Sequence, residues 1–93
     1  MKDQFIIYFK DMGIHYQAEV KAFDLEGVRV YDVYYSVRPR PVPAIRVQVY
    51  AGRANGEVIY WRQRLTGAKD ELIEPAFIEA IGFAIEQAGM SNS

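Results

Sequence analysis

Five segments in which apolar and polar residues alternate precede one segment with a helical period, and this order constrains the fold more than any other feature. The alternation is clearest from Ile14 to Phe23, where nearly every second side chain is apolar. The segment from about Glu74 to Ala88 has the 3.6-residue period, with Pro75 in its first turn and Gly89 where helices commonly stop. The pattern predicts an α+β two-layer sandwich, in which a five-stranded antiparallel meander sheet carries one C-terminal helix packed on one face.

The other four predicted strands are separated by turn signals and by one proline-rich segment. They span Phe5 to Lys10, Val28 to Val37, Ala44 to Tyr50 and Glu57 to Leu65. The three prolines between Arg38 and Pro43 cannot donate backbone hydrogen bonds, so this segment is predicted to be a stiff connector. Because 93 residues have room for one hydrophobic core, residues 1–89 are predicted to form a single domain and residues 90–93 a flexible tail.

Cysteine content and hydropathy indicate the cellular compartment in which the protein is expected. The chain has no cysteine, which excludes disulfides, zinc ribbons and thiol nucleophiles and is typical of a reducing compartment, so a cytoplasmic protein is expected. An acidic residue, Asp3, precedes a short apolar run without a small-residue cleavage site, which is unlike a signal peptide. No run approaches 18 apolar residues, so no membrane association is expected.

The charge is balanced overall but unevenly distributed. A net charge of −1 argues against binding to nucleic acid driven by charge alone. Between Val28 and Arg64, however, only Asp32 and Glu57 oppose a set of arginines. The set consists of Arg29, Arg38, Arg40, Arg46, Arg53, Arg62 and Arg64.

Strand register predicts which charges lie side by side, since residues directly opposite each other in a hairpin must point to the same face of the sheet. A turn centred on Leu25 and Glu26 pairs Val20 with Tyr31 in the core and sets Glu19 opposite Asp32 on the open face. The same turn pairs Ala18 with Val33 and Tyr16 with Tyr35. Two adjacent carboxylates can serve acid–base chemistry or hold a hard cation, so they define a hypothetical enzyme or metal site.

In the second hairpin, the length of the turn decides which residues lie opposite each other on the same face of the sheet. A two-residue turn at Asn55 and Gly56 would place Val49 against Arg62 and so mix the two faces. A three-residue loop from Ala54 to Gly56 pairs Val49 with Trp61 instead, and this register is predicted. It also pairs Ile45 with Leu65 in the core and, on the open face, Tyr50 with Tyr60, Gln48 with Arg62 and Arg46 with Arg64.

Tyrosines and arginines on one sheet face are a candidate binding surface, because aromatic rings stack on bases and guanidinium groups bind phosphate. The alternative is that these residues provide cross-strand packing and solubility. The only histidine, His15, has no serine, cysteine or second histidine at a catalytic or metal-binding spacing, so no catalytic residue, metal ligand or cofactor is assigned. The candidates for ligand or anion binding are Arg46, Arg62, Arg64, Tyr34, Tyr50 and Tyr60.

The predicted helix has more apolar surface than one flat sheet would cover. At 100° per residue its apolar positions span roughly 220°, about twice what packing on one sheet requires. Ile78 and Ile85 lie well round this arc, so they are predicted to contact a second subunit. The leading hypothesis is a small non-catalytic homodimeric binding or interaction domain. Single-stranded nucleic-acid binding through the arginines and tyrosines is the alternative, and an enzyme or metal site at Glu19 and Asp32 is a further one.

Overall fold

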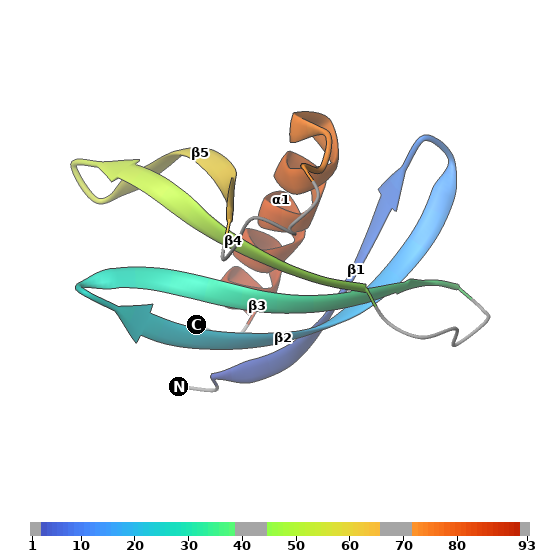
Figure 1. Ribbon diagram of the computed structural model, residues 1–93, viewed down its shortest axis with the longest axis horizontal. Helices are drawn as coiled ribbons and strands as arrows, with labels where there is room; N and C mark the ends of the chain where they lie inside the picture. The colour runs from blue at the N-terminus through green and yellow to red at the C-terminus, as the bar shows by residue number, and fades with distance from the viewer. Residues whose placement is uncertain (1–2, 39–44, 66–71, 92–93) are drawn as a thin grey trace.

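The computed structural model describes residues 3–38, 45–65 and 72–91, and these form one five-stranded antiparallel sheet with one helix packed on it. The strands follow each other in meander order β1-β2-β3-β4-β5, so the predicted α+β two-layer fold is confirmed (Figure 1). The elements are β1 (Gln4–Asp11), β2 (Ile14–Leu25), β3 (Val28–Val37), β4 (Ile45–Ala54), β5 (Glu57–Arg64) and α1 (Pro75–Ser91).

The C-terminal end of the helix differs from the prediction, and two predicted segments are not described. Helix α1 continues through Gly89 to Ser91, past the predicted stop, so the first two residues of the predicted tail are helical. Residues 92 and 93 and the predicted proline connector over residues 39–43 lie outside the described residues.

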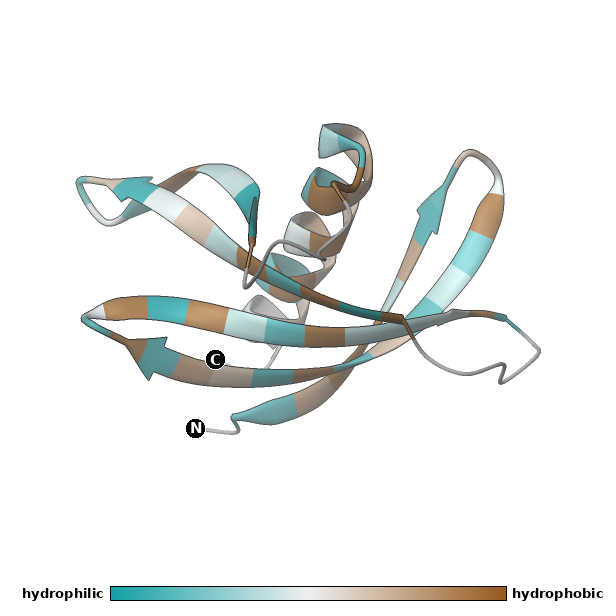
Figure 2. Ribbon diagram, viewed as in Figure 1, coloured by the Kyte–Doolittle hydropathy of each residue, from teal (hydrophilic) through white to brown (hydrophobic). Residues whose placement is uncertain are grey.

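The sheet curls around α1, and this curvature places the core. The helix lies across the inner face, with β1 on one side and β5 on the other (Figure 1). Hydrophobic and hydrophilic residues alternate along β2 and β3 because only one face of each strand contacts the core (Figure 2). The buried core consists of Ile7, Phe9, Ala18, Val20, Val33, Tyr35, Val47, Val49, Trp61, Phe77, Ile78, Ile81, Ala84 and Ile85.

Three two-residue turns, each ending in glycine, connect the hairpins. Met12-Gly13, Glu26-Gly27 and Asn55-Gly56 all have positive φ at both positions, between 50° and 82°. Positive φ at both central residues is the geometry of a type I′ turn, whose twist matches that of the flanking strands. Glycine at the second position adopts this conformation without a side-chain penalty.

The Glu26-Gly27 turn corrects the predicted register of the first long hairpin. Because the turn lies one residue later than predicted, every partner shifts by two residues, and Val20 pairs with Val33. A shift of two preserves the face of every side chain. It separates the predicted carboxylate pair, however, because Lys21 lies opposite Asp32 and Tyr34 lies opposite Glu19.

The Asn55-Gly56 turn corrects the second predicted register. The two-residue turn is present, although an unbroken ladder from it would set core residues opposite open-face residues. A β-bulge next to the turn brings residues of the same face opposite each other again. Arg53 pairs with Val58 but Gly52 pairs with Tyr60, so Ile59 is the extra residue. Trp61 therefore points to the core, as predicted, but it lies opposite Ala51 rather than Val49. Ile45 and Leu65, which were expected to be core residues, are exposed, as is the extra residue Ile59.

The curl of the sheet also overturns the predicted role of two helix residues. Ile78 and Ile85 are only 2% and 4% exposed in the single chain, and both belong to the core. The predicted second-subunit contact assumed a flat sheet, which would cover a narrower arc of the helix. Because the curled sheet buries both residues, they need no second subunit to cover them.

A glycine in the middle of α1 has a packing role. Gly82 is buried against the indole ring of Trp61, and a Cβ added there would meet ring atoms Cγ, Cδ1 and Cδ2. Trp61 in turn contacts the Tyr31 ring at a centroid distance of 5.6 Å. Since glycine weakens a helix interior, its position here is explained by the close approach of the indole to the helix backbone.

Candidate functional site

The six predicted ligand-binding residues lie on one face of the sheet, the side that points away from α1, which we call the open face. The register connects them across three strands, since Tyr34 pairs with Arg46, and Tyr50 pairs with Arg62. Arg64 pairs with Gln48 rather than with Arg46, so the two arginines are diagonal neighbours instead of directly opposite. The predicted face is therefore present, with its internal pairing changed.

A hydrogen-bonded network occupies the centre of this face. Arg46 donates from Nε to Oδ1 of Asp32 at 3.0 Å, and Gln48 donates from Nε2 to the same oxygen at 3.0 Å. Arg64 donates from Nη1 to Oε1 of Gln48 at 2.7 Å. Gln48 is only 7% exposed, so its amide is satisfied within the protein as a buried polar group requires.

The network reduces the capacity of the open face for an anion. The hydrogen bond to Asp32, followed by its negative charge, raises the pKa of Arg46 above its ordinary value, so this guanidinium stays charged. Its charge is already opposed by a carboxylate, and an arriving phosphate would compete with that ion pair. Two of the three candidate arginines, Arg46 and Arg64, thus have protein partners.

The third arginine lies over a tyrosine. The guanidinium carbon of Arg62 is 4.4 Å from the centroid of the Tyr60 ring, a cation–π contact between exposed residues. The Tyr60 ring in turn covers Gly52 on the neighbouring strand, where an added Cβ would meet it. Of the predicted set, Arg62 and Tyr60 form the most accessible pair.

The observed register does not support an enzyme or metal site at Glu19 and Asp32. Glu19 and Asp32 are not directly opposite, and Asp32 is bonded to Arg46 and Gln48. Within residues 3–38, 45–65 and 72–91, no group of three histidine, aspartate or glutamate side chains could hold a metal ion. His15 is exposed, and its backbone carbonyl accepts a hydrogen bond from the Arg38 amide at 2.9 Å.

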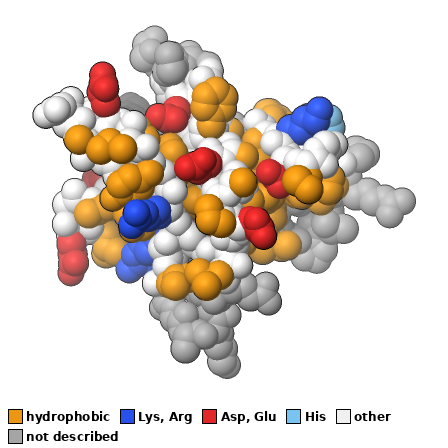
Figure 3. Space-filling model, turned by 90° about the horizontal axis from the view of Figure 1, so that it is seen from above, with side chains coloured by type: hydrophobic (Ala, Val, Ile, Leu, Met, Phe, Trp, Pro, Cys, Tyr) orange, Lys and Arg blue, Asp and Glu red, His pale blue; other side chains and the backbone are white. Residues whose placement is uncertain are grey.

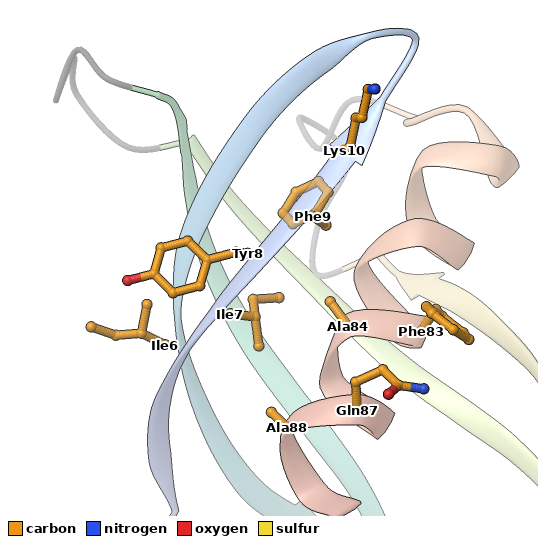
Figure 4. A pocket seen from close by; sticks show the side chains of 9 residues that line it. All are labelled: Ile6, Ile7, Tyr8, Phe9, Lys10, Phe83, Ala84, Gln87 and Ala88. Atoms are coloured by element: carbon orange, nitrogen blue, oxygen red, sulfur yellow. The ribbon is translucent and has the colours of Figure 1, made fainter. Parts of the chain in front are cut away.

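Strand β1 has an exposed apolar edge that the sequence reasoning missed. Ile6 and Tyr8 are 55% and 59% exposed and point to the side of β1 that is opposite Ile7 and Phe9 (Figure 4). The signal was present in the sequence, because Phe5 to Phe9 is apolar throughout and does not alternate. A strand with apolar residues on both sides is typical of a sheet that is covered on both faces.

The backbone of β1 is open along the same edge. Asp3 and Ala22 are hydrogen bonded through the backbone, and Asp11 and Ile14 close the Met12-Gly13 turn, so odd-numbered residues of β1 bond to β2. The N–H and C=O groups of Ile6, Tyr8 and Lys10 consequently point away from β2. No other described strand pairs with this edge.

A groove of about 560 Å³ runs between β1 and α1 beside this edge (Figure 4). Ile7 and Ala84 face each other across it, while the Phe83 ring points away from β1 (Figure 4). We call the outer edge of β1, with Ile6, Tyr8, Lys10 and this groove, the β1 edge.

Comparison with known proteins yields no match to a protein-family model, a curated protein or a solved structure. The only described helix, α1, does not have the length and apolar character that crossing a bilayer requires.

Proposed function

We propose that the chain is an interaction domain that forms a homodimer by pairing the β1 edges of two copies into one continuous sheet. The observation that carries this proposal is the exposed apolar run on a strand whose outer backbone groups have no strand partner among the described residues. Edge strands of this kind are templates for pairing with another chain.

The two edges of the sheet differ in a way that favours β1. Natural proteins protect free edges with bulges, charges or proline. Strand β5 has such devices, namely the bulge at Ile59 and the charges of Arg62 and Arg64. Strand β1 has no proline and no bulge, and its one basic residue, Lys10, lies near the turn. An unprotected edge is what a pairing surface requires.

The β1 edge is also self-complementary. If two copies pair antiparallel about a twofold axis at Ile7, each Ile6 lies opposite Tyr8 of the second copy, and each Gln4 lies opposite Lys10. The exposed apolar side chains then cover each other, and aromatic–aliphatic cross-strand pairs of this kind stabilise a sheet. Lys10 meets no like charge in this register, and Asp3, which comes opposite Asp11 of the second copy, already forms an ion pair with Arg29 at 3.0 Å. The symmetry is that of an isologous dimer.

Substitution of Ile6 by lysine tests the interface. We expect the parent protein to have twice the chain mass at micromolar concentration by light scattering after size exclusion, and Ile6→Lys to have the mass of one chain. The added charge would lie against Tyr8 of the second copy and would lose solvation without gaining a counter-charge.

Ile59→Lys is the matched control, because Ile59 is 62% exposed on the opposite edge of the sheet. It should leave the dimer intact. A parent protein with the mass of one chain would contradict the proposal, as would dissociation by Ile59→Lys to the same extent as by Ile6→Lys.

Single-stranded nucleic-acid binding is a second candidate, supported by the accessible Arg62 and Tyr60 pair on the same face as Tyr34 and Tyr50. We expect it to be weak, since Arg46 and Arg64 have protein partners. Retention on immobilised polythymidine at low salt that falls steeply as salt rises would support it, and the absence of retention at low salt would remove it.

A further inference from the structure

The opposite side of α1 has a second groove with a different character. It lies between β5 and α1, has a volume of about 440 Å³, and includes the exposed side chains of Ile59 and Phe83. Trp61 lines its floor. Glu79 and Glu86 line the helix side, and we call this site the acidic groove.

The spacing on α1 places these groups together. Glu79, Phe83 and Glu86 are four and three residues apart, so they follow one face of the helix with the aromatic ring between the two carboxylates. Seen from above in Figure 3, hydrophobic side chains are interspersed with acidic and with basic ones over this side of the molecule. Phe83 is 61% exposed, which is unusual for a phenylalanine in the middle of a helix.

The carboxylates of the acidic groove take part in none of the ion pairs between described residues. Helix α1 contains no lysine or arginine, and neither Glu79 nor Glu86 forms an ion pair with a described residue. By contrast, the groove beside β1 includes Lys10 and no acidic residue among its described lining. Two grooves that flank one helix therefore differ in charge and favour different partners.

We propose that the acidic groove binds a cationic amphipathic segment of another protein, whose apolar side chains contact Ile59, Trp61 and Phe83 while its lysines or arginines pair with Glu79 and Glu86. The bulge at Ile59 interrupts the outer edge of β5, so side-chain contacts rather than strand addition hold this segment. The site lies on the edge that the homodimer leaves open, and it does not depend on the dimer.

Trp61 provides a built-in reporter, because it is the only tryptophan of the chain and it lines the groove. Its indole Nε1 is buried and has no hydrogen-bond partner among the described residues, so a nearby change in packing or polarity should alter its emission. The probe is a synthetic amphipathic peptide of leucine and lysine, free of tryptophan and tyrosine, with a second peptide in which glutamate replaces every lysine.

We expect the leucine–lysine peptide to change Trp61 emission in a saturable way and the leucine–glutamate peptide to leave it unchanged. The double variant Glu79→Gln with Glu86→Gln should weaken binding about tenfold, and Phe83→Ala should weaken it as well. The charge-matched control is Glu19→Gln with Glu26→Gln, which removes two exposed carboxylates elsewhere and should leave the affinity unchanged.

Three results would overturn the proposal. One is equal response to both peptides, and another is equal loss of affinity in the two double variants, which would indicate attraction to the overall charge. The third is that no peptide binds while Glu79→Gln with Glu86→Gln changes the oligomeric mass, which would make a second copy the occupant. Because Ile6→Lys should bind the leucine–lysine peptide normally, failure of the dimer and failure of this site are distinguishable.

Discussion

Replacing Gly82 by alanine should lower the free energy of unfolding by about 1–3 kcal/mol, even though alanine is the better helix former by about 1 kcal/mol. The added Cβ would meet the buried indole ring of Trp61, which packs between the helix and Tyr31. Interiors are close-packed, so neither group can move aside without disturbing its neighbours. Urea denaturation with an unchanged m-value measures the difference.

Gly89→Ala is the control for this prediction. Gly89 is also in α1, but no described group lies within 4 Å of its added Cβ, so the substitution should stabilise the protein by up to about 1 kcal/mol. A Gly82→Ala variant as stable as the Gly89→Ala variant would show that the indole does not pack on the helix backbone as described.

Truncation of Ile78 or Ile85 to alanine should cost about 2–5 kcal/mol of stability, because each side chain is buried in the core and its removal leaves a cavity. For a domain of this size, such a loss is a large part of the total stability. The folded fraction should keep its oligomeric mass, since neither side chain reaches the surface. Thermal and urea unfolding give the first quantity, and light scattering gives the second.

Phe83→Ala, on the exposed side of the same helix, serves as the comparison and should change stability by no more than about 0.5 kcal/mol. If Ile78→Ala retained the parent stability but had half the parent mass, these residues would belong to an interface and the core would be wrong.

The predicted fold was correct because local alternation is a strong signal. The faces of Val20, Val33, Val49 and Trp61 followed from odd and even numbering, and all four side chains are buried. Register was not predictable to the residue, because a shift of two at Glu26-Gly27 leaves every face unchanged. That small shift is enough to replace a carboxylate pair with Lys21 opposite Asp32.

The β-bulge at Ile59 shows a second limit. The rule that opposite residues share a face correctly placed Trp61 in the core. Either a longer loop or an extra residue within a strand can satisfy this rule, however. The sequence Asn55-Gly56 is a strong type I′ signal, and it was overruled on the assumption of an unbroken ladder. Local turn chemistry was the better guide here.

The candidate surfaces were predicted less well than the fold, and sheet curvature is the reason. The wide apolar arc of α1 was correctly identified, but the sheet itself covers Ile78 and Ile85 by curling around the helix. The exposed apolar side chains that belong to the proposed surfaces include Ile6 and Tyr8 on β1 and Phe83 on α1 instead. Only the unbroken apolar run from Phe5 to Phe9 marked any of them in the sequence.

Hydrogen exchange at single backbone amides of β1 tests the pairing of two β1 edges most directly, because it reads the hydrogen bonds themselves. In one chain, the amides of Ile6 and Tyr8 point to solvent while those of Ile7 and Phe9 bond to β2. We expect the outward amides to be protected, and their protection to increase with protein concentration and to vanish in Ile6→Lys. Fast exchange at Ile6 and Tyr8 at every concentration, beside slow exchange at Ile7 and Phe9, would contradict the dimer.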